Sequence, residues 1–232
     1  MELDPIARVR SPYKEKFAIP RQPGLVTAAK GRIEFLAGYQ NDEMLQGIEQ
    51  FSHLWLIFVF HHTQEQGWKP SVRPPRLGGN AKMGVLASRS TFRPNPIGLS
   101  VVKLENVIRL DKDVSLEISG MDLVDGTPLL DIKPYLPYAD SLPDAQAGYA
   151  QQEPDVELDV VFTQNAQAQL SALSGQAELQ TLIEQVLAQD PRPAYRKGKP
   201  DAKQYGVKLA EFNVCFMVIN SQCQVTDIQS LT

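Results

Sequence analysis

The continuous apolar segment Leu54–Phe60, with the sequence LWLIFVF, constrains the possible folds of this chain more than any other feature. The segment is too short for a buried helix and is rich in β-branched and aromatic residues, so it predicts a strand. A strand without polar alternation is typical of a sheet that is covered on both faces. We therefore expect Leu54–Phe60 to be a strand buried on both faces.

Short apolar segments separated by turn residues continue this β pattern through the first half of the chain. The predicted strands are Leu25–Val26, Ile33–Phe35, Met83–Ser88, Leu99–Leu104, Val107–Leu110, Val114–Ile118 and Leu123–Ile132. The Lys30-Gly31 pair predicts a hairpin turn between the first two strands. Asn41 is a favourable N-cap for a short helix that ends near Gln50.

The second part of the chain has a different pattern. A proline-rich and polar segment, residues 135–150, predicts a domain boundary. Residues 167–188 have the apolar spacing of a helix that Gly175 could interrupt. Strands are predicted around that helix, at Val156–Phe162, Val207–Phe212, Val214–Ile219 and Val225–Ile228. We expect a mainly β domain over residues 1–145 and a small α+β domain over residues 146–232.

Composition argues against several classes of protein. No apolar run approaches the ~18 residues of a transmembrane helix, and the first residues lack the pattern of a secretory signal. The two cysteines, Cys215 and Cys223, have the spacing of neither a redox pair nor a zinc site. We expect buried reduced thiols, no membrane contact and a cytoplasmic location.

Charge is distributed unevenly along the chain. The net charge of −4 argues against a general nucleic-acid binder. No acidic residue occurs from Gln66 to Leu104, and this stretch contains the basic residues Lys69, Arg73, Arg76, Lys82, Arg89, Arg93 and Lys103. An acid-free, arginine-rich stretch in an acidic protein predicts a local site for a ligand that carries negative charge.

The first motif in this stretch is Arg73–Asn80, with the sequence RPPRLGGN. Rigid prolines hold Arg73 and Arg76, while the glycines allow a ligand to approach the backbone. Arginine suits both phosphates and the faces of bases. A solvated structural loop is the alternative.

The second motif is Arg89–Gly98, with the sequence RSTFRPNPIG. Prolines on both sides of Asn95 fix the chain there. A rigid turn that presents Arg93, Asn95 and backbone amides suits recognition of a base edge. The alternative is a purely structural turn.

Two further motifs are less specific. Met121–Pro128 carries the carboxylates Asp122 and Asp125, which could act in acid–base chemistry or could cap a turn. Pro20–Leu25 offers backbone donors in a proline-framed loop, and it could equally be a plain Pro-Gly turn.

The segment Asp190–Lys199 forms a basic cluster in an otherwise acidic region. Tyr195 could stack on a base beside Arg196 and Lys197, so an RNA contact and a solvated loop both stay open.

Histidine placement and missing motifs narrow the chemistry. Adjacent side chains on a strand point to opposite faces, so His61 and His62 should not bind one metal. With three histidines and no thiolate cluster, no metal site is expected. His62 is a candidate for ligand contact because it lies at a strand end. There is no G-x-G-x-x-G after a strand, no P-loop and no readable catalytic triad, so a Rossmann-type site is not supported.

Together these motifs resemble the TsaA-like (YaeB, TrmO) family from about residue 6 to residue 215. The resemblance is carried by Val9–Lys14, Pro20–Leu25, Phe51–Trp55, Arg73–Asn80, Arg89–Gly98, Met121–Pro128, Asp131–Tyr135 and Asp190–Gly198. It implies a methyltransferase that uses S-adenosylmethionine (SAM) to modify N6 of threonylcarbamoyladenosine at position 37 of a threonine tRNA. It also implies a closed antiparallel β-barrel, a homodimer with the cofactor near the interface, and a C-terminal domain that contacts tRNA.

The resemblance also implies roles for individual residues. The expected SAM pocket consists of Pro23, Gly24, Leu25, His62, Thr63, Arg89, Leu99, Ser119, Gly120, Met121 and Asp122. The expected catalytic residues are Asn95, Arg93 and Asp122, with the first two on the substrate side. The residues expected to bind tRNA are Arg73, Arg76, Tyr195, Arg196 and Lys197. His62 departs from the family pattern, which has glutamine, although both can donate a hydrogen bond.

The resulting hypothesis is an in-line methyl transfer that needs no metal. N6 is a poor nucleophile, so alignment matters, and proximity can contribute roughly 7–11 kcal/mol at best. Asn95 would accept a hydrogen bond from the amine, through its side chain or a neighbouring carbonyl, and Asp122 would bind the cofactor. Two alternatives stay open: a non-catalytic RNA-binding module, and a small-molecule methyltransferase with the same SAM site.

Overall fold

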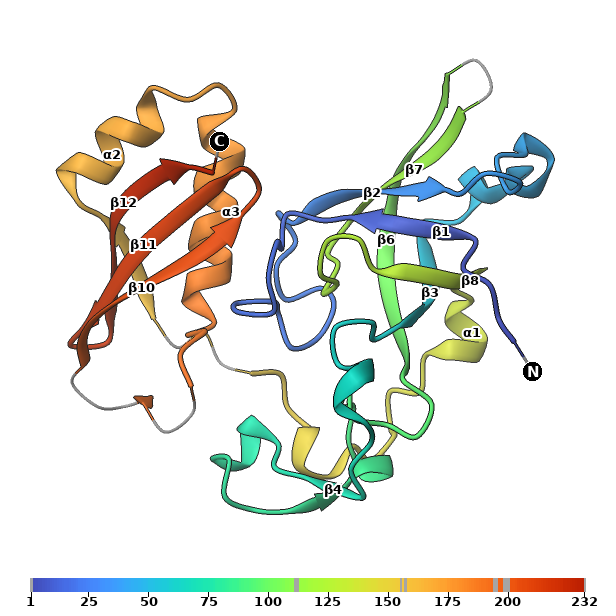
Figure 1. The fold of residues 1–232 in the computed structure, drawn as a ribbon, viewed down its shortest axis with the longest axis horizontal. Coiled ribbons are helices and arrows are strands. Elements are labelled where there is room, and N and C mark those ends of the chain that lie inside the picture. Colours follow the sequence, from blue (N-terminus) through green and yellow to red (C-terminus); the bar gives the residue numbers. More distant parts are fainter. Residues whose placement is uncertain are drawn as a thin grey trace.

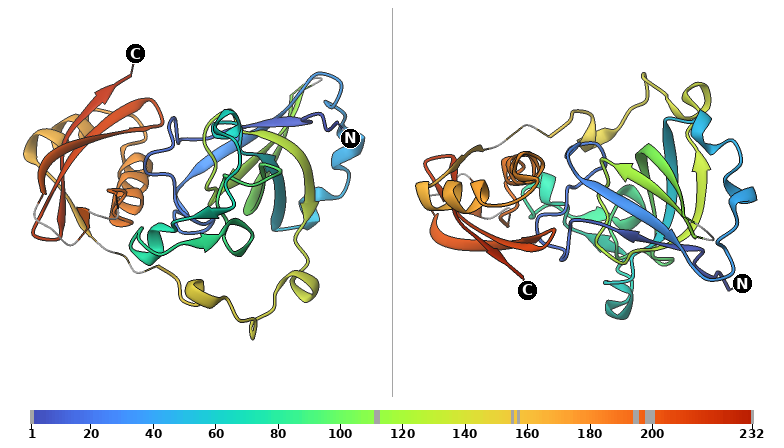
Figure 2. Two further views of the ribbon diagram at one scale, coloured as in Figure 1. Left: turned by 60° about the horizontal axis from the view of Figure 1, so that its bottom comes forward. Right: turned by 90° about the horizontal axis from the view of Figure 1, so that it is seen from above.

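A computed structural model describes residues 2–110, 113–154, 156, 158–193, 196–197 and 201–231. The strands form two bodies that lie side by side, one containing β1–β3 and β6–β8 and the other containing β10–β12 (Figure 1). An extended segment that contains α1 (Pro137–Asp140) runs along one side and joins them (Figure 2). The predicted division at residues 145 and 146 falls within this connection and stays a prediction.

The N-terminal body is a closed barrel with the strand order β1-β2-β7-β6-β3-β8. Every neighbouring pair is antiparallel, which confirms the predicted mainly β fold with a closed antiparallel barrel. Its strands are β1 (Ala7–Arg10), β2 (Lys30–Phe35), β3 (His53–Val59), β6 (Ile97–Leu110), β7 (Asp113–Ser119) and β8 (Pro128–Pro134). The two strands predicted over residues 99–110 are one long strand, β6, with an irregularity between Leu104 and Asn106.

The apolar segment forms β3, but only one of its faces is fully buried. Leu54, Leu56 and Phe58 point into the barrel, whereas Trp55 and Val59 are partly exposed. The prediction of burial on both faces is therefore wrong. The outer face is apolar because part of it lines a cavity, as described below.

Two local predictions also fail for identifiable reasons. Lys30-Gly31 is not a hairpin turn but the start of β2, where a Cβ on Gly31 would lie 2.3 Å from the carbonyl oxygen of Arg10. Met83–Ser88 is not one strand. β5 (Met83–Gly84) pairs with β4 (Ser71–Val72), and a 3-10 turn, Val85–Ala87, follows.

Short 3-10 turns take the place of longer helices in the N-terminal body. Asn41 caps the first turn as predicted, since its side chain accepts a hydrogen bond from the backbone N–H of Glu43. Gly47, with φ of 85°, separates that turn from the next. The 3-10 turns are Asp42–Leu45, Ile48–Gln50, Gln64–Gln66, Pro75–Leu77, Val85–Ala87 and, in the connection, Gly148–Ala150.

The C-terminal body is an α+β unit, as predicted. Its sheet has the order β10-β11-β12-β9, with β9 (Asp159–Phe162), β10 (Asp201–Leu209), β11 (Phe212–Ile219) and β12 (Gln222–Ser230). Helices α2 (Gln164–Ser171) and α3 (Gln176–Ala188) pack against it (Figure 1). Gly175, with φ of 72°, divides the two helices at the predicted position.

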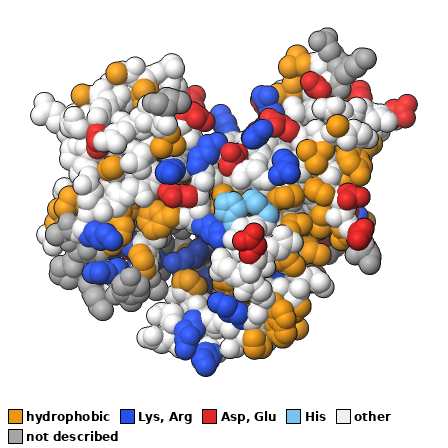
Figure 3. Space-filling view, in the orientation of Figure 1, with side chains coloured by type: hydrophobic (Ala, Val, Ile, Leu, Met, Phe, Trp, Pro, Cys, Tyr) orange, Lys and Arg blue, Asp and Glu red, His pale blue; other side chains and the backbone are white. Residues whose placement is uncertain are grey.

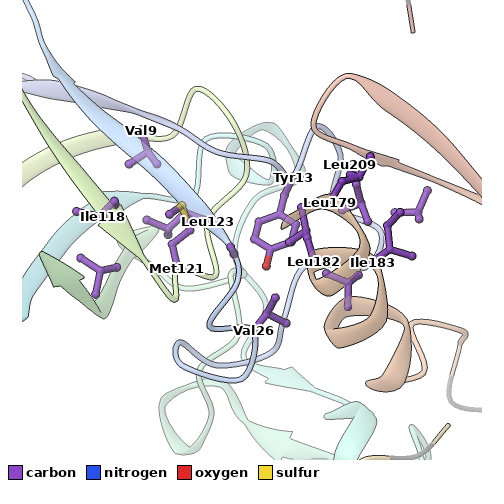
Figure 4. Close-up of a cluster of buried hydrophobic side chains, with 14 of the residues drawn as sticks. Val9, Tyr13, Val26, Ile118, Met121, Leu123, Leu179, Leu182, Ile183 and Leu209 are labelled. Carbon is purple, nitrogen blue, oxygen red and sulfur yellow. The ribbon is translucent and has the colours of Figure 1, made fainter. Parts of the chain in front are cut away.

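A buried apolar contact joins the two bodies. Tyr13 lies in the loop between β1 and β2, is fully buried, and bridges to Leu209 of β10. Leu182 and Ile183 of α3 lie on the same side of its ring as Leu209, and Met121 and Leu123 lie on the opposite side (Figure 4). The long loop after β1 is therefore held between the barrel and the C-terminal body. Among the described residues, no helix combines the length and apolar character needed to cross a bilayer.

Candidate active site

A cavity of about 760 Å³ opens beside the ends of β3 and β6. This volume lies within the range of about 300–1,000 Å³ typical of small-molecule sites. Five segments distant in sequence surround it: residues 16–22, 55–66, 88–93, 97–99 and 122–127. In the space-filling view, the histidines lie at the centre of one face with lysine and arginine side chains beside them (Figure 3).

The two adjacent histidines form one wall of the cavity. Both line it, and their ring centroids are 4.3 Å apart. The prediction that they point to opposite faces is wrong, because they lie in a turn beyond the end of β3, where Thr63 N–H donates to the carbonyl of Phe60 at 3.2 Å. Burial and the neighbouring His62 lower the pKa of His61, which favours its neutral form.

Asp122 is the one carboxylate among the described residues that line the cavity. Burial raises the pKa of Asp122 to about 6, and this effect outweighs the opposing hydrogen bond from Ser100 and the charge of Arg89. Ser100 lies on β6, is almost fully buried, and donates its hydroxyl hydrogen bond to Oδ1 of Asp122. The site therefore holds one carboxylate that is ionised at neutral pH and close to its titration range.

The neighbouring Asp125 has a different role. Its carboxylate accepts hydrogen bonds from the backbone N–H of Ser11 at 2.8 Å and from the ammonium of Lys14 at 3.2 Å. It thus ties the loop after β1 to the barrel, which is a structural role but not the turn cap considered for this motif.

Arg89 and Arg93 both line the cavity but have different partners. Nη1 of Arg93 donates to the backbone carbonyls of Val85 at 3.1 Å and Ser88 at 2.7 Å, so it fixes the segment that precedes Arg89. Nη1 of Arg89 donates to Oε1 of Gln22 at 2.5 Å. Arg93, which was predicted to lie on the substrate side, therefore also holds the cavity wall that carries Arg89.

Asn95 does not line the cavity in this single chain. It is exposed, and its backbone carbonyl accepts a hydrogen bond from the N–H of Ile97 at 2.7 Å. Leu99, two residues after Ile97, does line the cavity, although its side chain is 55% exposed. The rigid turn predicted around Asn95 is present, at the edge of the site.

The other predicted cofactor residues divide into two groups. His62, Thr63, Arg89, Leu99 and Asp122 line the cavity. Pro23, Gly24, Leu25, Ser119, Gly120 and Met121 lie beside it and do not line it.

The second group is nevertheless held together. The N–H of Gly24 donates to the carbonyl of Gly120 at 2.8 Å, so these two segments meet as the resemblance implies. The Met121 side chain is buried in the core, and the Ser119 hydroxyl donates to Glu105 at 2.5 Å, so both side chains are already engaged.

The residues predicted to bind tRNA are spread over the surface. Arg73 and Arg76 are exposed and do not line the cavity, and Arg76 donates to the backbone carbonyl of Gln152 in the connection. Arg196 is exposed and Lys197 is partly exposed. Tyr195 lies outside the described residues.

Two residues of the site gave no clear signal in the sequence. Lys16 lines the cavity from the loop after β1, beside Arg21 of the predicted Pro20–Leu25 motif, and its Nζ donates to the carbonyl of His62 at 2.6 Å. Ser100 does not line the cavity but bonds to Asp122, and a single serine near the start of the apolar strand β6 is the only available hint. Among the described residues, no group of three histidine, cysteine or acidic side chains could hold a metal ion.

Sequence comparison decides the family of the chain. Family models of the tRNA-methyltransferase O (TrmO) N-terminal and C-terminal domains match residues 8–141 and 155–231. The chain belongs to the TrmO family. A tRNA (adenine(37)-N6)-methyltransferase of Escherichia coli (strain K12) is 55% identical to it over 225 residues, which cover 97% of this chain and 96% of that protein.

Further relatives agree with this assignment. A putative S-adenosylmethionine-dependent methyltransferase RcsF of Pseudomonas aeruginosa is 49% identical over 215 residues, covering 91% of this chain and 90% of that protein. A crystal structure of TrmO from Pseudomonas aeruginosa has a TM-score of 0.81 at 38% identity, covering 99% of this chain and 98% of that chain. The TrmO fold thus extends over both bodies of the structure.

Proposed function

We propose that this TrmO family member transfers the methyl group of SAM to N6 of adenine 37 in tRNA. The observation that carries the proposal is a TrmO sequence over both domains combined with a cavity in which Asp122 is the only described carboxylate. The E. coli relative is named for this reaction. A barrel also explains why the chain lacks the glycine motif of Rossmann enzymes, because that motif belongs to a different fold.

The chemistry of the cavity fits SAM. When bound, this cofactor supplies a methyl group made electrophilic by the positive charge on sulfur. Cationic walls alone would repel that charge, so Asp122 would face the cationic end of the cofactor, where opposite charges attract. Arg89 and His62 would serve the carboxylate and other polar groups of the same molecule.

For the remaining cofactor contacts, we propose that Pro23–Leu25 and Ser119–Met121 contribute backbone groups. A hydrogen bond between Gly24 and Gly120 holds these two segments together, next in sequence to Gln22 and Asp122, which line the cavity. Thr63 and Leu99 would complete the pocket.

The substrate side consists of the turn around Asn95 and Arg93. We propose that an oxygen of Asn95 accepts a hydrogen bond from the N6 amine and favours its pyramidal form. Arg93 keeps this segment rigid through its bonds to two backbone carbonyls. The proton of N6 can leave to solvent after transfer.

From the family resemblance, we propose that the substrate is the threonylcarbamoyl-modified adenosine of a threonine tRNA. Exposed Arg73 and Arg76 would contact the phosphate backbone, and Tyr195, Arg196 and Lys197 would add contacts from the C-terminal domain.

We further propose a homodimer, in the cytoplasm, with the cavity close to the interface. The exposed apolar side chains Ile97 and Leu99 line the cavity. A second copy would cover this apolar surface, as is usual for such patches, and could bring further residues to the site.

Mass spectrometry of nucleosides tests the proposal directly. Purified protein and SAM are incubated with threonine tRNA that carries, or lacks, the threonylcarbamoyl group. The proposal predicts a methylated product from adenosine 37 of the modified tRNA. No new methylated adenosine in either tRNA would overturn it, while equal methylation of both would overturn only the threonylcarbamoyl specificity.

A further inference from the structure

The loop between β1 and β2, residues 11–29, touches both the cavity and the C-terminal body. We propose that the C-terminal body sets the shape of the cofactor cavity through this loop, with Gln185 of α3 as a positioning residue. The C-terminal body would then contribute to SAM affinity even when no RNA is present. This inference rests on the proposed function and adds a role for the C-terminal body other than tRNA contact.

Backbone hydrogen bonds fix the first part of the loop to the sheet of the C-terminal body. Lys14 N–H donates to the carbonyl of Lys208 at 3.3 Å, and Ala210 N–H donates to the carbonyl of Pro12 at 2.7 Å. The carboxylate of Glu15 accepts from the N–H of Lys208 at 3.0 Å. These bonds make this part of the loop an extension of the C-terminal sheet.

Helix α3 holds the last part of the loop. Oε1 of Gln185 accepts a hydrogen bond from the backbone N–H of Ala28 at 2.9 Å. The hydroxyl of Thr27 lies 3.4 Å from the same oxygen. A single side chain of the C-terminal body therefore satisfies a backbone donor that lies just before β2.

The middle of the loop forms a wall of the cavity. Lys16 and Gln22 both line it, and they bond to His62 and Arg89 respectively, at 2.6 and 2.5 Å. A displacement of this loop would therefore move a histidine and an arginine of the proposed cofactor site.

The packing behind this middle part is uneven. Phe17 stacks on Tyr205 and Phe216 of the C-terminal sheet, with ring centroids 6.4 and 6.5 Å apart, while the residues around it border a void. This second cavity, of about 200 Å³, separates them from Val186, Gln189 and neighbouring residues. Ala18, at the centre, has φ of 67°, which a non-glycine residue adopts only when its surroundings hold it there. The bonds at the two ends of the loop and the stacking of Phe17 therefore decide where the cavity wall lies, and all of these contacts come from the C-terminal body.

Calorimetric titration of the full-length protein with SAM, without RNA, tests the inference. Gln185→Ala should weaken binding by about three- to ten-fold, the effect of one lost hydrogen bond. Gln185→Glu keeps an acceptor oxygen and should bind nearly as wild type. Gln180→Ala is the matched control, because it lies on the same helix and bonds only to Glu184 in the described structure.

Kinetics add a readout that a loss of stability would not produce. With Gln185→Ala, the KM for SAM should rise while kcat at saturating SAM stays unchanged, and thermal unfolding should show a folded protein. An affinity of Gln185→Ala within two-fold of wild type, or a Gln185→Glu variant as weak as Gln185→Ala, would overturn the inference alone. Wild-type protein that does not bind SAM would overturn the proposed function as well.

Discussion

The buried hydroxyl of Ser100 donates a hydrogen bond to the carboxylate of Asp122, across the wall of the barrel. Two effects therefore act on Asp122 in opposite directions. Burial favours its neutral form, while the hydrogen bond favours the charged form, and burial prevails, so that its pKa is about 6. The carboxylate proposed to face a cationic cofactor is thus mostly charged at neutral pH, and a small drop in pH would protonate it.

Removal of the Ser100 hydroxyl should change how SAM affinity depends on pH. In wild type, affinity should fall as the pH drops through about 6, because Asp122 becomes neutral. In Ser100→Ala, the midpoint should move upward, to roughly pH 7, since a hydrogen bond to the charged form is lost.

Calorimetric titrations from pH 5.5 to 8.5 measure this shift. Ser115→Ala, on β7 of the same barrel, should behave as wild type. Because His61 also lines the site and gains charge at low pH, Asp122→Asn serves as a reference that retains only the histidine effect. An unchanged midpoint in Ser100→Ala would contradict the prediction.

Asp122→Asn should stabilise the protein while it weakens SAM binding. The folded-state pKa of Asp122 lies above its ordinary value, so the folded state holds the proton more tightly, and stability from this group is lost as pH rises through about 6. Asparagine avoids that loss and still accepts from Ser100. We expect a gain on the order of 1–2 kcal/mol at pH 8 and roughly half of that at pH 5, measured by urea unfolding. An equal effect at both pH values would refute the role of ionisation.

Gly98 should not tolerate alanine. It pairs with Phe58 across β3 and β6, and a Cβ would lie 2.2 Å from the aromatic ring. Because the ring lines the cavity, Gly98→Ala should cost about 1–3 kcal/mol of stability and also weaken SAM binding. Gly84→Ala is the control, since its Cβ would meet no atom within 4 Å. Equal unfolding free energies for the two variants would argue against this close packing.

Arg73 should contribute to tRNA binding and not to SAM binding. It is exposed and does not line the cavity. Arg73→Ala should weaken tRNA binding and reduce the slope of log Kd against log salt concentration by about 1, the loss of one phosphate contact. Arg109→Ala removes an arginine already paired with Asp42 and Glu49 and should leave the slope unchanged. A full salt slope in Arg73→Ala would exclude a phosphate contact.

Asn95 should act on the chemical step. Asn95→Ala should bind SAM normally, because the residue does not line the cavity. Its single-turnover methylation rate should fall on the order of 100-fold, as for other groups that stabilise a transition state. Rapid-quench assays with excess enzyme measure this rate. Full single-turnover activity in this variant would show that the assignment is wrong.

The sequence by itself determined those features that depend on neighbours along the chain. The apolar run of β3, the helix break at Gly175 and the N-cap at Asn41 follow from local patterns, and the motifs from Val9 to Gly198 together indicated the family. The boundaries of β2 and β5 were less certain, because tertiary pairing decides where a strand begins.

Only the tertiary structure decided which of these segments meet. Ser100 contacts Asp122, Lys16 contacts His62, and Gln185 contacts Ala28, each pair far apart in sequence. Periodicity shows that a face is apolar, but it does not show which element covers that face. For the same reason the outer face of β3 gave no sign that it lines a cavity, and the serine of β6 gave no sign of the carboxylate that it holds.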